Sequence, residues 1–160
     1  MSTSPATDRL EGYPLALHEA VTGAFGQWYS ARITAIIADS GVVVPPGSEE
    51  DIAHAAADAG AWVAHELLAL LATDVDEQTT NPLHLLRGAA RFATPLLDGL
   101  GVPRPVRDEF ETRAMPDDVH AVGPLAWIDM GDHVHEAGIG WGAWKAATVL
   151  TRRRAEGKLG

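Results

Sequence analysis

Residues 14–41, PLALHEAVTGAFGQWYSARITAIIADSG, decide the fold class of this chain. At about 100° per residue, apolar side chains such as Leu17 and Phe25 recur on one face of the helix that this stretch predicts. Pro14 suits the first turn of a helix, and Gly41 suits its left-handed end. We therefore expect one long helix here, with its apolar face in a core.

A second helix is expected after the break GVVVPPGS. Ser48 is followed by three acids at 49–51, which is typical of a helix start because a hydroxyl caps the first turn and the helix dipole favours acids there. The apolar stripe from Ile52 to Leu70 predicts a helix that ends near Thr73. Two consecutive amphipathic helices predict an antiparallel hairpin.

The rest of the chain predicts further helices and no sheet. A helix opens at Asn81–Pro82 and is interrupted at Pro95, and others are expected at about 106–113 and 135–155, with a loop over 115–132. The strand-like stretch VVVP is too short to start a sheet. The expectation is an all-α single domain of about five helices over residues 14–160, its N-terminal hairpin packed on a C-terminal helical unit, preceded by a flexible segment over 1–13.

The composition excludes several classes of protein. The chain has 160 residues, of which 46% are hydrophobic and none is cysteine. This size suits one globular domain, and the lack of cysteine excludes disulfides, thiolate metal sites and cysteine nucleophiles. No apolar run approaches the roughly 20 residues of a membrane span, and the N-terminus lacks the pattern of a secretion signal. We expect a soluble, cytoplasmic protein without a membrane partner.

The formal net charge of −10 arises in the first half of the chain. Residues 1–80 hold 12 acids and 2 bases, whereas residues 81–160 hold 10 of each. An acidic half repels a phosphate backbone, so nucleic acid is not expected as the main partner. A candidate phosphate-binding cluster exists at Arg152, Arg153 and Arg154, but cations at a helix C-terminus also complement the helix dipole.

The densest titratable segment is PDDVHAVGPLAWIDMGDHVHE at 116–136. Imidazoles and carboxylates are ligands of zinc, iron and manganese. The candidate ligands of a divalent metal are His120, His133 and His135, with Asp117, Asp118 or Glu136 as a further ligand or general base. Both His133 and His135 could reach one ion only from an extended or turn backbone, because a helix would point them apart. The alternative is that these side chains cap helix ends and bond backbone groups.

The last predicted helix is apolar on two sides. Gly138 and Gly142 line one side with small residues that allow another backbone to approach closely, and Trp141 and Trp144 face the other way. Either the helix is central and the 115–132 segment covers the tryptophans, or an exposed aromatic patch binds a partner. The candidate partner-binding residues are Trp141, Trp144 and Trp127.

Four segments of the C-terminal half correspond to an NPL opening, a GVPPVxRD-like turn, a FPDDVY-like segment and an HExGxxWGxxKA helix, at Asn81–Leu83, Gly101–Asp108, Met115–His120 and His135–Ala146. In this respect the chain resembles an uncharacterised family of small helical proteins of actinobacteria. Met115 and His120 depart from the family's Phe and Tyr. The resemblance implies a bacterial cytosolic protein with a compact helical C-terminal unit, and it carries over no catalytic residue.

The function expected from these observations is that of a non-enzymatic interaction or regulatory module without a cofactor, which binds a protein partner or itself through the aromatic surface. No GxSxG, HExxH or Glu-x-x-His pattern marks a catalytic constellation. The alternative is a small metal-dependent enzyme that uses the 117–136 segment.

Overall fold

The computed structural model of the chain describes residues 10–157. The predicted flexible segment over 1–13 therefore lies outside the described residues as far as residue 9. The first described helix, α2 (Gly12–Ser40), begins two residues before Pro14. As predicted, α2 ends at Gly41, whose φ of 75° is in the left-handed region and whose N–H donates to the Ala38 carbonyl.

Helix α3 (Ser48–Ala72) follows the expected break, but its first turn differs from the prediction. Ser48 does not cap the helix: its hydroxyl donates to the Pro45 carbonyl at 2.7 Å, and the cap position is occupied by Gly47 in a left-handed conformation. The three acids at 49–51 lie in the first turn, as expected. The turn before α3 places Ser48 within the helix, and the sequence pattern alone did not reveal that shift.

The second half of the chain forms shorter elements and one long helix. Asn81 caps α4 through a 2.8 Å hydrogen bond from the Leu83 N–H, as the Asn–Pro pair predicts. The elements in chain order are α4 (Pro82–Gly88), η1 (Ala89–Phe92), α5 (Thr94–Gly99), α6 (Glu109–Ala114), η2 (Trp127–Met130) and α7 (Asp132–Ala155). The fourth helix is shorter than expected, and the last helix begins three residues earlier.

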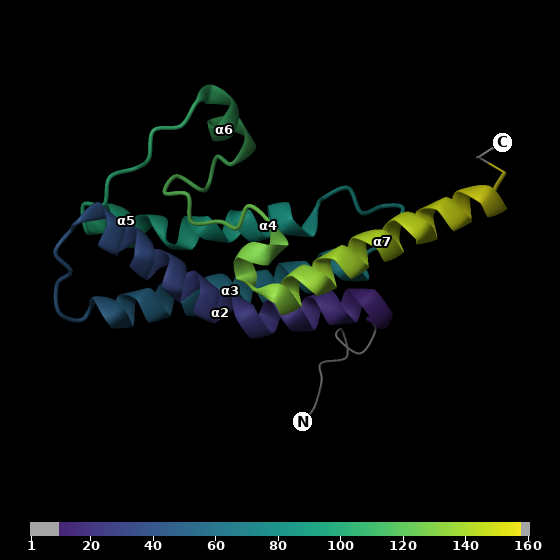
Figure 1. The fold of residues 1–160 in the computed structure, drawn as a ribbon, viewed down its shortest axis with the longest axis horizontal. Coiled ribbons are helices and arrows are strands. Elements are labelled where there is room, and N and C mark those ends of the chain that lie inside the picture. The colour runs from purple at the N-terminus through teal and green to yellow at the C-terminus, as the bar shows by residue number, and fades with distance from the viewer. Residues whose placement is uncertain (1–9, 158–160) are drawn as a thin grey trace.

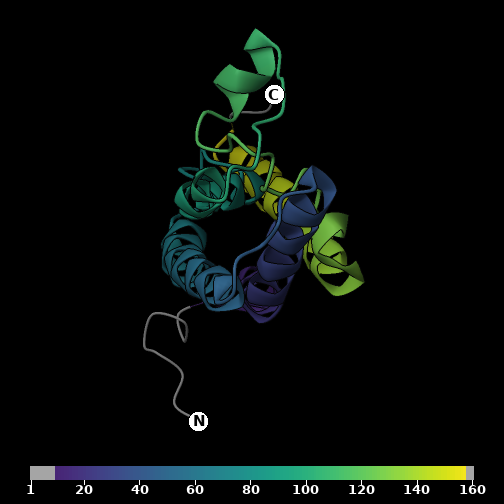
Figure 2. The same cartoon turned by 90° about the vertical axis from the view of Figure 1, so that its left-hand side faces the viewer.

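The described part of the chain is an all-α single domain without strands, as predicted. Helices α2 and α3 form the antiparallel hairpin, with α7 against α2, and with α4, η1 and α5 against α3 (Figure 1, Figure 2). The C-terminal elements thus flank the hairpin on two sides. Helix α6 stands away from the other helices in both views.

Aromatic side chains of α2 fill the core at its contact with the C-terminal elements. The rings of Phe25 and Tyr29 stack at 5.3 Å between centroids, and both residues are buried. The Tyr29 hydroxyl donates to the Ala89 carbonyl of η1 at 2.8 Å. Burial raises the pKa of Tyr29 far above its usual value, because the phenolate would have no solvent around it.

Helix α3 is apolar enough to meet a length and composition test for a membrane span, with a mean hydropathy of 1.2 over its best window. In the fold, its buried residues Ile52, Ala59, Val63 and Leu67 belong to the hydrophobic core. Core helices of Ala- and Leu-rich bundles pass the same test, so this property alone does not assign α3 to a membrane.

Candidate functional site

The segment between α6 and α7 is held to the bundle by two arginines. The guanidinium of Arg32, from α2, donates to the Ala121 carbonyl at 2.8 Å. Arg87, from α4, donates to the carbonyls of Pro124 and Leu125 at 2.8 and 2.9 Å. Each arginine satisfies backbone acceptors that have no partner in a helix or sheet, so an irregular segment is fixed in one conformation.

Asp118 is the buried carboxylate of this segment, with 2% of its surface exposed. Its two oxygens accept hydrogen bonds from the backbone N–H groups of Val122 at 2.6 Å and Gly123 at 3.0 Å. The Arg107 guanidinium lies 3.7 Å from it. A Cβ at Gly123 would lie 3.0 Å from the carboxylate and 3.1 Å from the Cα of Arg87, so this close approach favours glycine. The two N–H donors and the Arg107 cation therefore offset the free-energy cost of burying the Asp118 carboxylate.

A strained residue marks the same turn. Ala121 has a φ of 59°, in the left-handed region that a residue with a Cβ rarely adopts. Its carbonyl accepts the Arg32 hydrogen bond, and its N–H donates to the Asp118 carbonyl at 3.3 Å. These two hydrogen bonds, one from a side chain and one within the backbone, thus maintain a conformation that the residue alone would avoid.

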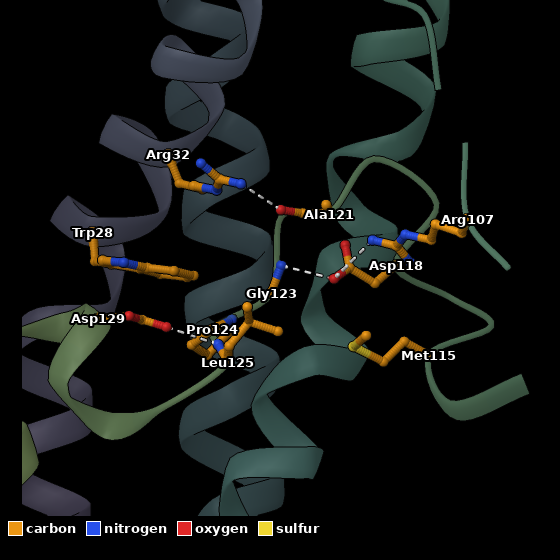
Figure 3. Close-up of a pocket in the computed structure, with 10 residues that line it drawn as sticks. All are labelled: Trp28, Arg32, Arg107, Met115, Asp118, Ala121, Gly123, Pro124, Leu125 and Asp129. Carbon is orange, nitrogen blue, oxygen red and sulfur yellow. Dashed lines mark hydrogen bonds and ion pairs between the residues drawn. The ribbon is translucent and has the colours of Figure 1, made fainter. Parts of the chain in front are cut away.

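A hollow of about 390 Å³ lies between this segment and α2. Trp28 and Arg32 of α2 form one wall, and Arg107, Asp118 and Met115 lie across from them (Figure 3). Asp129 closes the lower side, where its carboxylate accepts from the Leu125 N–H at 2.8 Å. The hollow therefore combines an aromatic face with two guanidinium groups and two carboxylates.

We call residues 103–117 the arm, because they leave the bundle after the buried Val102 and return to it at the buried Asp118. The arm carries α6, which has no buried residue, and it projects from the bundle (Figure 1, Figure 2). Two large apolar side chains of the arm lie in solvent: Val106 is fully exposed and Phe110 is 79% exposed. Both side chains are left uncovered by the described part of the chain.

Two ion pairs lock the base of the arm. Arg104 contacts Asp98 of α5 at 2.6 Å, and His120 Nε2 donates to the same carboxylate at 2.9 Å. The second pair is Arg107 with Asp118. The arm is therefore joined at both ends to α5 and to the segment that follows it, while its tip stays clear of the core.

The carboxyl of Asp98 should titrate in strong acid. Hydrogen bonds first from Arg104 and then from His120 lower the pKa of Asp98 from 3.8 to about 2. A carboxyl whose pKa is lower in the folded chain stabilises the fold above its unfolded pKa, and this contribution is lost as the pH falls from about 4 through 2. The stability difference between wild type and Asp98→Asn should therefore shrink over that range in denaturant unfolding.

Carbon-13 NMR of the Asp98 carboxyl checks this directly. We expect the Asp98 carboxyl of the wild type to titrate with a midpoint near pH 2. Because Arg104 is the larger cause, Arg104→Gln should raise the midpoint more than His120→Gln does. A titration midpoint of Asp98 at the usual value of an aspartate would contradict the contacts of Arg104 and His120 with this carboxylate.

The three histidines predicted as metal ligands occupy different surroundings. His120 is buried and bonded to Asp98, and its Nδ1 has no hydrogen-bond partner among the described residues. His133 is exposed and His135 is half-buried, both on the first turn of α7, where two residues two positions apart point in different directions. Within residues 10–157, no group of three or more His, Asp or Glu side chains is placed to hold a metal ion.

The tryptophans predicted to contact a partner lie wholly or partly inside the fold. Trp141 is buried, with 7% exposed, and Lys145 Nζ lies 5.3 Å from the centroid of its ring. Trp127 and Trp144 are half-buried and pack against the core. Of the two interpretations of the last helix, the packed one describes Trp141, which offers no exposed ring.

The predicted packing glycines behave differently from each other. A Cβ at Gly138 would lie 2.5 Å from Cγ and 2.6 Å from Cδ2 of Trp127, so η2 packs directly on this glycine. A Cβ at Gly142 would meet nothing within 4 Å. Close packing is therefore found at Gly138, through the Trp127 side chain and not through another backbone as predicted, and it is absent at Gly142.

The arginines predicted to bind phosphate are only partly free. Arg152 pairs with Asp74 and with Asp76, both in the connection after α3. Arg153 and Arg154 are exposed. One of the three cations is thus used within the chain to attach the C-terminal half of α7 to the bundle.

The arm and the contacts that hold this part of the chain in place were not predicted from the sequence. Val106 and Phe110 are isolated apolar residues in a charged, proline-flanked stretch, and that isolation is the signal that could have identified them as exposed. No local signal identifies Arg32 or Arg87, since their acceptors are 89 and 37 residues away. Comparison of the chain with protein-family models, with curated proteins and with solved structures gave no match.

Proposed function

We propose that this protein is a non-enzymatic interaction module that contacts a protein partner with the arm. The observation that carries the proposal is the full exposure of Val106 and the 79% exposure of Phe110 on the arm, whose helix α6 has no buried residue. Water around these side chains is released when a partner covers them, which favours association.

The ion pairs at the base of the arm support the proposal. The contacts of Arg104 with Asp98 and of Arg107 with Asp118 restrict the arm before any partner arrives. A segment that is ordered in advance loses less conformational entropy on binding than a free loop does. The arm therefore suits a specific contact better than a flexible tail of the same composition.

The hollow beside the arm adds a second contact point. Arg107 and Met115 belong to the arm and also line the hollow, so the hollow adjoins the arm. The paired charges and the Trp28 face suit a polar or aromatic side chain of the partner.

Replacing both exposed side chains should abolish the contact without affecting the fold. Proteins that the wild type retains from a lysate of its own organism should bind the variant Val106→Ser/Phe110→Ser about thirtyfold or more weakly. The reason is that a buried aromatic anchor contributes about 2 kcal/mol to the free energy of binding. Unfolding by denaturant should be unchanged, because neither side chain is buried in the chain.

The matched control is Val43→Ser, which removes an apolar side chain that is 89% exposed at the turn between α2 and α3. This variant should retain the same proteins as the wild type. Identical retention by the arm variant and the wild type would contradict the proposal. A divalent metal that native mass spectrometry finds on the wild type but not on His133→Ala would instead favour the metal-dependent enzyme.

A further inference from the structure

Helix α7 is attached to the bundle along one side only. Its C-terminal half extends past the ends of the neighbouring helices (Figure 1). On the attached side, Lys145 donates to the Gln78 carbonyl at 2.9 Å, and Arg152 pairs with Asp74. The opposite side of the helix therefore has no element of the described chain against it.

That opposite side carries an apolar stripe. Ile139 and Leu150 are 58% and 42% exposed, and Ala143 and Ala146 between them are exposed as well. These four positions follow the spacing i, i+4, i+7, i+11, so they lie on one face of the helix within an arc of about 60°. We call Ile139, Ala143, Ala146 and Leu150 the α7 stripe.

The α7 stripe has the shape of a surface that fits its own copy. Its middle is small, because Ala143 and Ala146 are flanked by Gly142, around which a Cβ would find open space. Its ends are large, with Ile139 and Leu150 about 16 Å apart along the axis. Two such stripes packed together let the helix backbones approach closely at the alanines, while the large side chains cover the two ends.

Charge decides the direction of the pairing. Glu136 and Arg154 are 18 residues apart, which is five whole turns, so they lie on the same edge of the α7 stripe at its opposite ends. Both are exposed, and neither has an ion-pair partner within residues 10–157. Two copies arranged in parallel would put the two Glu136 side chains, and the two Arg154 side chains, on opposite edges of the contact without a Glu–Arg pair. An antiparallel pair places Glu136 beside the partner's Arg154 twice, on the same edge.

We infer that a second copy of this chain docks on the α7 stripe, antiparallel, about a two-fold axis between Ala143 and Ala146. Ile139 then lies opposite the partner's Leu150, and two Glu–Arg pairs lie along one margin of the interface. The arm is not part of this surface, so the dimer does not depend on the contact proposed for the arm.

The interface is small. A stripe of about three helical turns buries less than the roughly 800 Å² per partner of a standard interface. We therefore expect a dimer dissociation constant on the order of 10 µM. The dimer should weaken with added salt, because its ion pairs are exposed.

Sedimentation equilibrium of the full chain at low salt tests the inference. We expect Glu136→Arg and Arg154→Glu each to weaken the dimer by about tenfold, because each variant replaces two attractive contacts by two repulsive ones. The double variant Glu136→Arg/Arg154→Glu restores attraction and should return to within about threefold of the wild type.

A second pair of variants separates packing from charge. Ala146→Glu should leave a monomer, while Ala57→Glu, at an exposed alanine of α3, should leave the dimer unchanged. The chain has no cysteine, so cross-linking of Ile139→Cys with Leu150→Cys reports the direction. A wild type that stays monomeric at several hundred micromolar, or a dimer that the charge reversals do not change, would overturn the inference, and so would cross-linking of Ile139→Cys with itself.

Discussion

Asp118→Ala should destabilise the fold by about 3–5 kcal/mol, the usual effect of removing one partner of a buried ion pair. The substitution leaves the buried backbone N–H groups of Val122 and Gly123 without acceptors, and it leaves the nearly buried Arg107 without its carboxylate. A total stability of about 5–15 kcal/mol is typical of a domain, so this is a large share. We expect the turn around Ala121 to lose its conformation first.

The neighbouring residue provides the control. Asp117 is exposed, so Asp117→Ala removes the same chemical group one position earlier and should change stability by less than about 0.5 kcal/mol. Denaturant unfolding of the two variants gives the comparison, and hydrogen exchange at Val122 and Gly123 locates the effect. Equal effects of the two substitutions would contradict the role assigned to Asp118.

Gly138→Ala should destabilise the chain by about 1–3 kcal/mol, the usual cost of overpacking a filled core. The added methyl group would lie 2.5 Å from Cγ of Trp127, so the indole ring must move away from α7. Because η2 carries this ring, we expect the displacement to reach the segment that the two arginines hold. The intrinsic preference of alanine for helix opposes the effect by no more than about 1 kcal/mol.

The same helix contains the matched control. Gly142→Ala adds the same methyl group at an exposed position with open space around it, and should stabilise the chain by about 0.5–1 kcal/mol. Thermal unfolding of both variants should show a lower midpoint temperature than the wild type for Gly138→Ala and a higher one for Gly142→Ala. A Gly138→Ala variant as stable as Gly142→Ala would show that Trp127 moves aside without cost, and the contact with η2 would then lose its structural role.

The helical hairpin could be predicted from sequence because its determinants are local. The apolar period of residues 14–40, the left-handed glycine at 41 and the acids at 49–51 lie within a few residues of the elements they define. The Asn–Pro start of α4 is of the same kind. Caps and periodicity act over one or two helical turns, so they can be read along the chain.

Prediction was weaker where a residue's surroundings come from distant segments. The apolar character of α7 on two sides was visible, but whether Trp141 faced a core or a partner depended on the position of α2 and of the connection after α3. The open face of the helix proved to be the one with Ala143 and Ala146. Small residues do not reveal by themselves whether they allow close packing or merely lie in solvent.

The sequence by itself determined the all-α class, the hairpin and the approximate ends of the long helices, since these follow from backbone preferences and short-range patterns. Only the tertiary structure decided the candidate sites. The hydrogen bond from Arg32 to the Ala121 carbonyl joins residues 89 positions apart, and the exposure of Phe110 follows from the way α6 projects from the bundle. Burial and long-range hydrogen bonds depend on how elements pack, and many packings share one pattern of helices.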